Sequence, residues 1–296
     1  MGRKKAVRTR YIVGYTEDAR GRDAIALASA LAQTTGVQLD LVHVLSNPAP
    51  QDAAFPPERA VQEFLTGTAD GWLDEGLAMV PQGLPAHKHI SYADSFAEGL
   101  IEAATELNAS LIVVGAARNG LLKRFTIGSV ANALLHASPI PVALAPSGYR
   151  SEGAVTRMTC AVGTREGADT LLDVAVDASS RRHIPLRLIS LVALGPEETE
   201  SNSQSVERAR SHADSVRTRA AEKADEKTTV TALIAHGRTI EAAIESLEWD
   251  DNDIVLIGSS RLAQNSQIFL GATANKMLRA LPVPMVVVPR DYGSPC

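Results

Sequence analysis

Short apolar runs alternate with longer amphipathic segments along the whole chain. The runs are rich in Val, Ile and Leu and have the length of strands, whereas the longer segments repeat their apolar residues at helical spacing. Between positions 24 and 32, for example, Ala24, Ile25, Ala28 and Leu31 would form one stripe of a helix. This alternation predicts a parallel sheet covered by helices.

The expected strands form two sets of five. The first set covers 11–15, 39–45, 87–91, 111–115 and 142–145, and the second covers 158–162, 186–191, 230–234, 254–258 and 285–288. In the first half, helices are expected to begin near Arg22, Glu58, Asp94 and Ser129.

The second half of the chain repeats the first. The run LIVVG that ends at Gly115 corresponds to IVLIG ending at Gly258, and Gly128 corresponds to Gly271 at the same offset of 143 residues. Three prolines keep this register: Pro139, Pro141 and Pro146 correspond to Pro282, Pro284 and Pro289. Because 296 residues also exceed the usual size of one hydrophobic core, we expect two domains, 1–148 and 154–296, joined by a small and polar linker.

Composition narrows the functional classes. The net charge of −5 gives no general attraction to nucleic acid, and no apolar run approaches the ~20 residues that a membrane helix requires. Only Cys160 and Cys296 are present, which is typical of a protein of the reducing cytoplasm. His87 and His89 alternate on an expected strand, and we interpret them as surface residues.

Each half places glycines where a strand ends and where the next helix begins. These glycines are Gly115 and Gly128 in the first half, and Gly258 and Gly271 in the second. Ser129 and Val130 follow Gly128, and Ala272 follows Gly271. A glycine after a strand lets backbone N–H groups approach a phosphate, and a helix start adds its dipole. The same residue types also serve as ordinary turns and N-caps, so both interpretations stay open.

The run from Val113 to Val130 resembles the nucleotide-binding signature of the universal stress protein family: glycine, two residues, glycine, nine residues, then glycine with Ser or Thr. Arg118 and Arg261 stand where the signature has its second glycine. Either the loop has changed shape, because a side chain disfavours positive φ, or the guanidinium replaces lost contacts to phosphate.

This resemblance extends over nearly the whole chain. It implies two tandem, doubly wound α/β domains of the Rossmann-like, adenine nucleotide alpha hydrolase-like type, related by a pseudo-two-fold axis, with ATP bound mainly in domain 1 at the carboxyl ends of the strands. Val44 matches a position that meets the adenine base. Thr16 and Thr164 replace the family's acidic residue after the first strand, although Glu17 and Asp18 follow Thr16. Metal-supported triphosphate binding is therefore weakened, most in the second half.

The leading functional hypothesis is a regulatory stress-response protein that binds an adenine nucleotide at Thr16, Val44, Gly115, Arg118, Gly128, Ser129 and Val130, and more weakly at Gly258, Arg261 and Gly271. The alternative is an interaction module of the same fold that has lost nucleotide binding. In either case a protein partner or a homodimer is expected. An enzyme is disfavoured because the sequence has no nucleophile elbow, phosphate-loop lysine or paired-acid motif.

The prolines also predict how the halves meet. Pro141 and Pro284 begin the fifth strand of each half and have no N–H to donate, which places these strands at sheet edges. An open apolar edge strand is a pairing hazard. We therefore expect the strands at 142–145 and 285–288 to pair with each other in antiparallel fashion.

Overall fold

The computed structural model describes residues 9–47, 56–116, 128–151, 153–163, 167–193, 200–259 and 271–293. The first half contains β1 (Arg10–Gly14), α1 (Ala19–Ala32), β2 (Gln38–Ser46), α2 (Pro56–Ala78), β3 (Ala86–Ala93), α3 (Phe96–Glu106), β4 (Leu111–Gly115), α4 (Ser129–Ala137) and β5 (Val142–Ala145). The second half contains β6 (Arg157–Ala161), α5 (Ala168–Ser180), β7 (Leu186–Ala193), α6 (Glu200–Lys223), β8 (Val230–Gly237), α7 (Ile240–Glu245), β9 (Asp253–Gly258), α8 (Ala272–Ala280) and β10 (Met285–Val288).

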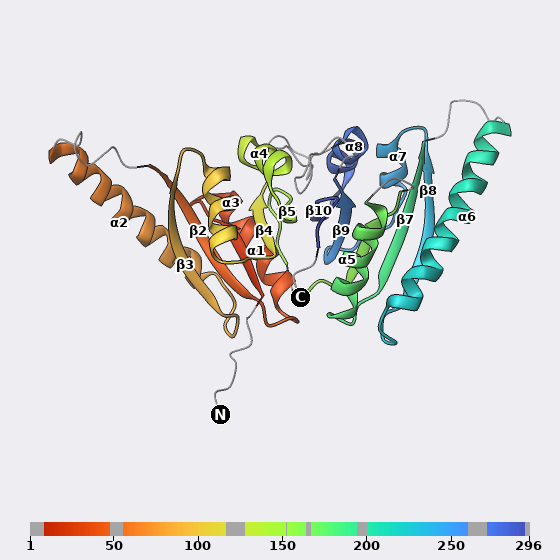
Figure 1. Ribbon diagram of the computed structural model, residues 1–296, viewed down its shortest axis with the longest axis horizontal. Coiled ribbons are helices and arrows are strands. Elements are labelled where there is room, and N and C mark those ends of the chain that lie inside the picture. Colours follow the sequence, from red (N-terminus) through yellow and green to blue (C-terminus); the bar gives the residue numbers. More distant parts are fainter. Residues whose placement is uncertain are drawn as a thin grey trace.

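All ten strands join one continuous sheet in the order β3-β2-β1-β4-β5-β10-β9-β6-β7-β8. Within each half the neighbours pair in parallel, which gives two doubly wound domains as predicted. The two domains meet at β5 and β10, which run antiparallel with Val286 opposite Ala143 (Figure 1). This confirms the predicted pairing of the fifth strands, and each edge covers the other.

Helices cover both faces of the sheet, and each core continues from one domain into the other. One core packs α1, α2, α5 and α6 against the sheet, and the other packs α3, α4, α7 and α8. Val13 and Cys160 belong to the first core, whereas Ile12 and Val255 belong to the second, as expected from the alternation of side chains along a strand. Two helices also lie at the outer ends of the sheet, α2 beside β3 and α6 beside β8 (Figure 1).

Three of the four expected helix starts lie two or three residues from the observed ones, and one of them is α2, which begins at Pro56 rather than near Glu58. Helix α1 begins at Ala19 rather than near Arg22, because the Asp18 side chain accepts hydrogen bonds from the backbone N–H groups of Arg20 and Gly21. Helix α3 begins at Phe96 rather than near Asp94, because Ser95 caps it by accepting a hydrogen bond from Glu98. In both places the N-cap residue fixes the helix start.

His43 lies in the interior of the first domain, on β2. His43 is buried, with its Nδ1 2.9 Å from the Tyr15 carbonyl oxygen and its ring edge-on to Trp72 and Phe96. His43 therefore packs in the interior of the first domain. Among the described helices, none is long and apolar enough to cross a membrane.

Candidate functional site

A cavity of about 430 Å³ lies at the carboxyl ends of the strands in the second domain. Its walls come from the ends of β6, β7 and β9 and from the starts of α5, α7 and α8. Small-molecule sites have this size, and open α/β sheets place them at this edge. Gly258 and Gly271, both expected site residues, line it. We call it the strand-end cavity.

The two glycines leave backbone groups accessible inside the strand-end cavity. Among the described residues, the nearest neighbour of a Cβ on Gly258 would be Leu171 Cδ2, at 3.7 Å, so none of them fills the space beside this glycine. Gly271 is the N-cap residue of α8 and has no side chain with which to cap the first turn. The first N–H groups of a helix lack partners within the helix and favour an anion. The start of α8 can therefore accept a phosphate.

Two residues of this cavity were missed by the sequence reasoning. Gly167 caps α5 with φ of 84°, a conformation that favours glycine, and the Arg290 side chain packs directly across it. The Arg290 backbone N–H donates to Ser259 Oγ at 3.0 Å, and its guanidinium donates to Asp291. Arg290 thus brings a cation to the wall. The only sequence signal was its position directly after the repeated Pro289.

The far wall of the cavity is apolar. Ile189 and Leu191 from β7 and Ile240 from α7 line it. A flat heteroaromatic ring suits such a surface, whereas the glycines and Arg290 suit charged groups. Among the described residues no group of three or more His, Cys, Asp or Glu is placed to hold a metal ion.

The corresponding end of the first domain is packed more closely. A Cβ on Gly115 would lie 2.3 Å from the Arg20 carbonyl oxygen, so the start of α1 rests on the end of β4. The reason lies in the helix starts. Helix α1 begins nine residues after Arg10, the first residue of β1, whereas α5 begins eleven residues after Arg157, the first residue of β6. The earlier start of α1 occupies space that stays open beside Gly258.

Thr16 lies in the loop that starts α1. Its Oγ1 donates to Asp18 Oδ1 at 2.9 Å, and Asp18 also forms an ion pair with Arg20 at 2.6 Å. Partial burial raises the pKa of the Asp18 carboxyl, but the hydrogen bonds from Arg20, Thr16 and the Gly21 N–H outweigh it, so the pKa lies below its ordinary value. Asp18, expected to replace the missing acid, is therefore engaged as the N-cap of α1.

The other expected residues of the first domain lie on two elements. Val44, near the end of β2, packs against α3, because a Cβ on Gly99 would lie 2.6 Å from Val44 Cγ1. Gly128 caps α4, and Ser129 and Val130 form its first turn. Arg118, Arg261 and Thr164 lie outside the described residues.

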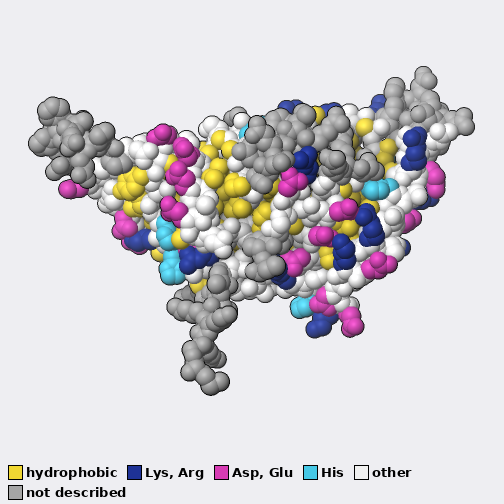
Figure 2. All heavy atoms as spheres, viewed as in Figure 1, with side chains coloured by type: hydrophobic (Ala, Val, Ile, Leu, Met, Phe, Trp, Pro, Cys, Tyr) yellow, Lys and Arg dark blue, Asp and Glu magenta, His cyan; other side chains and the backbone are white. Residues whose placement is uncertain are grey.

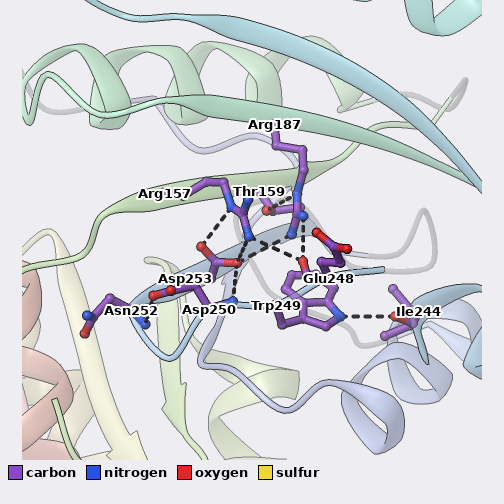
Figure 3. Close-up of polar contacts among 9 residues, drawn as sticks. All are labelled: Arg157, Thr159, Arg187, Ile244, Glu248, Trp249, Asp250, Asn252 and Asp253. Atoms are coloured by element: carbon purple, nitrogen blue, oxygen red, sulfur yellow. Dashed lines mark hydrogen bonds and ion pairs between the residues drawn. The ribbon is translucent and has the colours of Figure 1, made fainter. Parts of the chain in front are cut away.

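A charged cluster occupies the opposite end of the sheet in the second domain. Asp253 is buried and accepts hydrogen bonds from Nε and Nη2 of Arg157 (Figure 3). Arg187, also buried, donates to Thr159 Oγ1 at 3.0 Å and has its guanidinium 4.6 Å from the centre of the Trp249 ring. Burial lowers the pKa of the Arg187 guanidinium, and the charge of Arg157 lowers it further.

The first domain carries an acid at the equivalent position. Asp40 faces Ile12 in the register of β1 and β2, as Arg187 faces Thr159 in that of β6 and β7. The Asp40 carboxylate accepts hydrogen bonds from Gln38 and Arg10 and lies 2.9 Å from His89 Nε2. Burial raises the pKa of Asp40, but its partners, led by His89, outweigh that and hold it below its ordinary value. His87 is exposed, as expected, and the His89 side chain is 33% exposed with its ring held by Asp40, a contact that the sequence did not predict.

A doubly wound parallel sheet with a cavity at its carboxyl edge defines the class of α/β ligand-binding folds. The family model described as the universal stress protein family matches residues 8–146 and 155–289. Universal stress proteins of Mycobacterium tuberculosis (strain H37Rv) and Mycobacterium bovis are each 26% identical to the chain over 292 residues, which is 94% of this chain and 99% of theirs. The chain therefore belongs to the universal stress protein family.

Solved structures agree on the fold. A crystal structure of a universal stress protein from Archaeoglobus fulgidus superposes with a TM-score of 0.68 at 19% identity and covers 95% of this chain and 98% of that one. A functionally unknown protein from Pseudomonas aeruginosa superposes with a TM-score of 0.59 at 20% identity, over 97% of this chain and 94% of that one. The fold is thus shared over nearly the whole chain.

Proposed function

We propose that this universal stress protein binds an adenine nucleotide such as ATP in the strand-end cavity of its second domain, and acts as a regulatory protein of the stress response. The observation that carries the proposal is the open space beside Gly258, which faces the uncapped start of α8 at Gly271. Phosphates would bind at these backbone N–H groups and near Arg290. The adenine would pack against Ile189 and Leu191.

The proposal reverses the order that the sequence suggested for the two domains. Ser129 gives the first domain the better match to the signature, but the start of α1 lies against Gly115. Backbone approach to a phosphate requires that space, so the second domain is the stronger candidate. Nucleotide binding in the first domain, at Gly128 and Ser129, remains a prediction that the same experiment tests.

Calorimetry of the full chain with ATP tests both sites. Gly271→Asp should weaken ATP binding by roughly tenfold or more, because a carboxylate at the start of α8 repels phosphate. Gly128→Asp is the matched change in the first domain and should have the smaller effect. Gly153→Asp is the control, because in the described part of the chain a Cβ at this linker position would meet nothing within 4 Å.

Each outcome has a distinct meaning. Loss of binding in Gly128→Asp with full binding in Gly271→Asp would move the site to the first domain, and absence of ATP binding by the folded wild-type chain would refute the proposal. ATP turnover measured on the same samples should stay at background for a regulatory protein. Steady turnover would favour an enzyme.

A second candidate function, an interaction module, is favoured by an exposed apolar stripe on α2. Val61, Phe64 and Leu65 share one side of this helix, and Phe64 is 71% exposed. Hydrophobic side chains are visible on this half of the molecule, among acidic and basic ones (Figure 2). Light scattering on wild type and Phe64→Glu tests whether this stripe holds a homodimer. A monomeric wild-type chain would argue against that role.

A further inference from the structure

A second cavity, of about 390 Å³, lies between the two domains. Helices α1 and α5 flank it, on the face of the sheet where β5 and β10 meet, and we call it the junction cavity. Most of its wall is apolar and comes from both domains: Tyr11, Leu31, Met158, Val174, Leu256 and Val286. It is separate from the strand-end cavity, with which it shares no lining residue.

Arg182, two residues after the end of α5, reaches across this cavity to the first domain. Its Nη2 donates to the Tyr11 hydroxyl at 3.1 Å and to the Leu31 carbonyl oxygen at 3.0 Å, and its Nη1 donates to the Ala178 carbonyl oxygen at 2.9 Å. Its Nε is buried and has no hydrogen-bond partner in the described part of the chain. All of these partners are neutral, and no carboxylate of the described residues lies within ion-pairing distance of Arg182.

The other charged side chains of the cavity compensate each other. Arg181 Nε forms an ion pair with Asp177 at 2.9 Å, which leaves the single positive charge of Arg182. Tyr292 closes another side, where its hydroxyl donates to the Ser110 carbonyl oxygen at 3.3 Å. Burial raises the pKa of the Tyr292 hydroxyl to about 12, so this group stays neutral and adds no negative charge.

Arg182 is half-buried, its Nε is buried without a hydrogen-bond partner among the described residues, and no described carboxylate pairs with it. Such a cation beside an apolar wall is complementary to one class of ligand. We propose that the junction cavity binds a small amphiphilic monocarboxylate, whose carboxylate pairs with Arg182 and whose apolar body lies against Val174 and Met158. A polyphosphate does not suit this cavity, because a single cation remains there and Asp177 lies nearby. The ligand would contact both domains at once.

Octanoate is the probe, and octan-1-ol, with the same chain but no charge, is its control. Titration calorimetry of the full chain should give one saturable octanoate site, with octan-1-ol binding at least roughly tenfold more weakly. Arg182→Met, which removes the charge but keeps an unbranched side chain, should weaken octanoate binding by a similar factor. Arg217→Met, an exposed arginine on α6, should leave it unchanged.

Ala178→Trp provides a test that does not depend on Arg182, whose loss can weaken the contact between the domains. The larger side chain would fill the cavity and should abolish octanoate binding while circular dichroism shows a folded protein. Gly271→Asp should leave octanoate binding intact, which separates this inference from the proposed nucleotide site. The inference fails if the wild-type chain shows no saturable binding, if octan-1-ol binds equally well, if folded Ala178→Trp retains full affinity, or if Gly271→Asp removes it.

Discussion

The two domains share one fold but differ at both ends of their sheets. At the carboxyl end, α1 lies against Gly115 in the first domain, whereas no described residue of the second domain comes closer than 3.7 Å to the Cβ position of Gly258. At the opposite end, equivalent buried positions carry opposite charges, Asp40 in the first domain and Arg187 in the second. The duplicated fold therefore tolerates either charge, provided that neighbouring strands supply partners for it.

The comparison also shows how each charge is satisfied. The partners of Asp40 lie on its own strand and on β1 and β3. Arg187 donates a hydrogen bond to Thr159 and packs against the ring of Trp249. Asp253, at the start of β9, accepts a hydrogen bond from Arg157. Both clusters lie far along the strands from the ligand end of the sheet. We interpret them as structural elements that hold the strand starts together.

The largest effect is expected from Asp253→Asn, which leaves Arg157 and Arg187 without their carboxylate. Breaking a buried ion pair costs about 3 kcal/mol or more in the free energy of unfolding. Urea unfolding should show this loss, and amide exchange should accelerate in β6 and β9. Asp251→Asn, an exposed neighbour, is the control and should change stability by less than about 0.5 kcal/mol. Equal effects of the two variants would show that the cluster does not stabilise the second domain.

A smaller effect is expected from a matched pair of glycine substitutions that tests the difference between the ligand ends. Gly115→Ala should destabilise the first domain by about 1–3 kcal/mol, because its Cβ would lie 2.3 Å from the Arg20 carbonyl oxygen. Gly258→Ala should be nearly neutral for stability, since its nearest neighbour would be 3.7 Å away, but should reduce ATP binding. Urea unfolding and calorimetry measure the two effects. Similar stability losses at both positions would contradict the inference that α1 packs closely against Gly115 while Gly258 has space beside it.

The smallest effect is expected from Asp40→Asn, at about 1.5 kcal/mol near neutral pH, because hydrogen bonds to a charged group are lost. The folded-state pKa of Asp40 lies below its ordinary value, so its contribution is complete above the unfolded-state pKa and disappears as pH falls through the folded-state pKa. The stability difference between wild type and variant should therefore shrink below about pH 4. A difference that grows in acid would show that the charge of Asp40 is not what stabilises the domain.

The sequence by itself determined the architecture of this protein. Strand-length apolar runs, helical spacing between them and a repeat anchored at Gly115 and Gly258 predicted two doubly wound domains, and the prolines at 141 and 284 predicted the antiparallel junction. These features depend on periodicity and on local backbone chemistry, which are encoded within short segments. The resemblance to the family signature also predicted that a ligand would bind at the carboxyl ends of the strands.

Only the tertiary structure decided which candidate site is open and where charges are buried. The space beside a strand-end glycine depends on where the next helix starts, and Asp18 and Gly167 set those starts differently. The pairing of Asp40 with His89, and of Arg157 with Asp253, depends on the register between strands that are far apart in sequence. The junction cavity needs both domains in place, because Arg182 comes from one and Tyr11 from the other. Such contacts join residues distant in the chain, so no local pattern in the sequence could specify them.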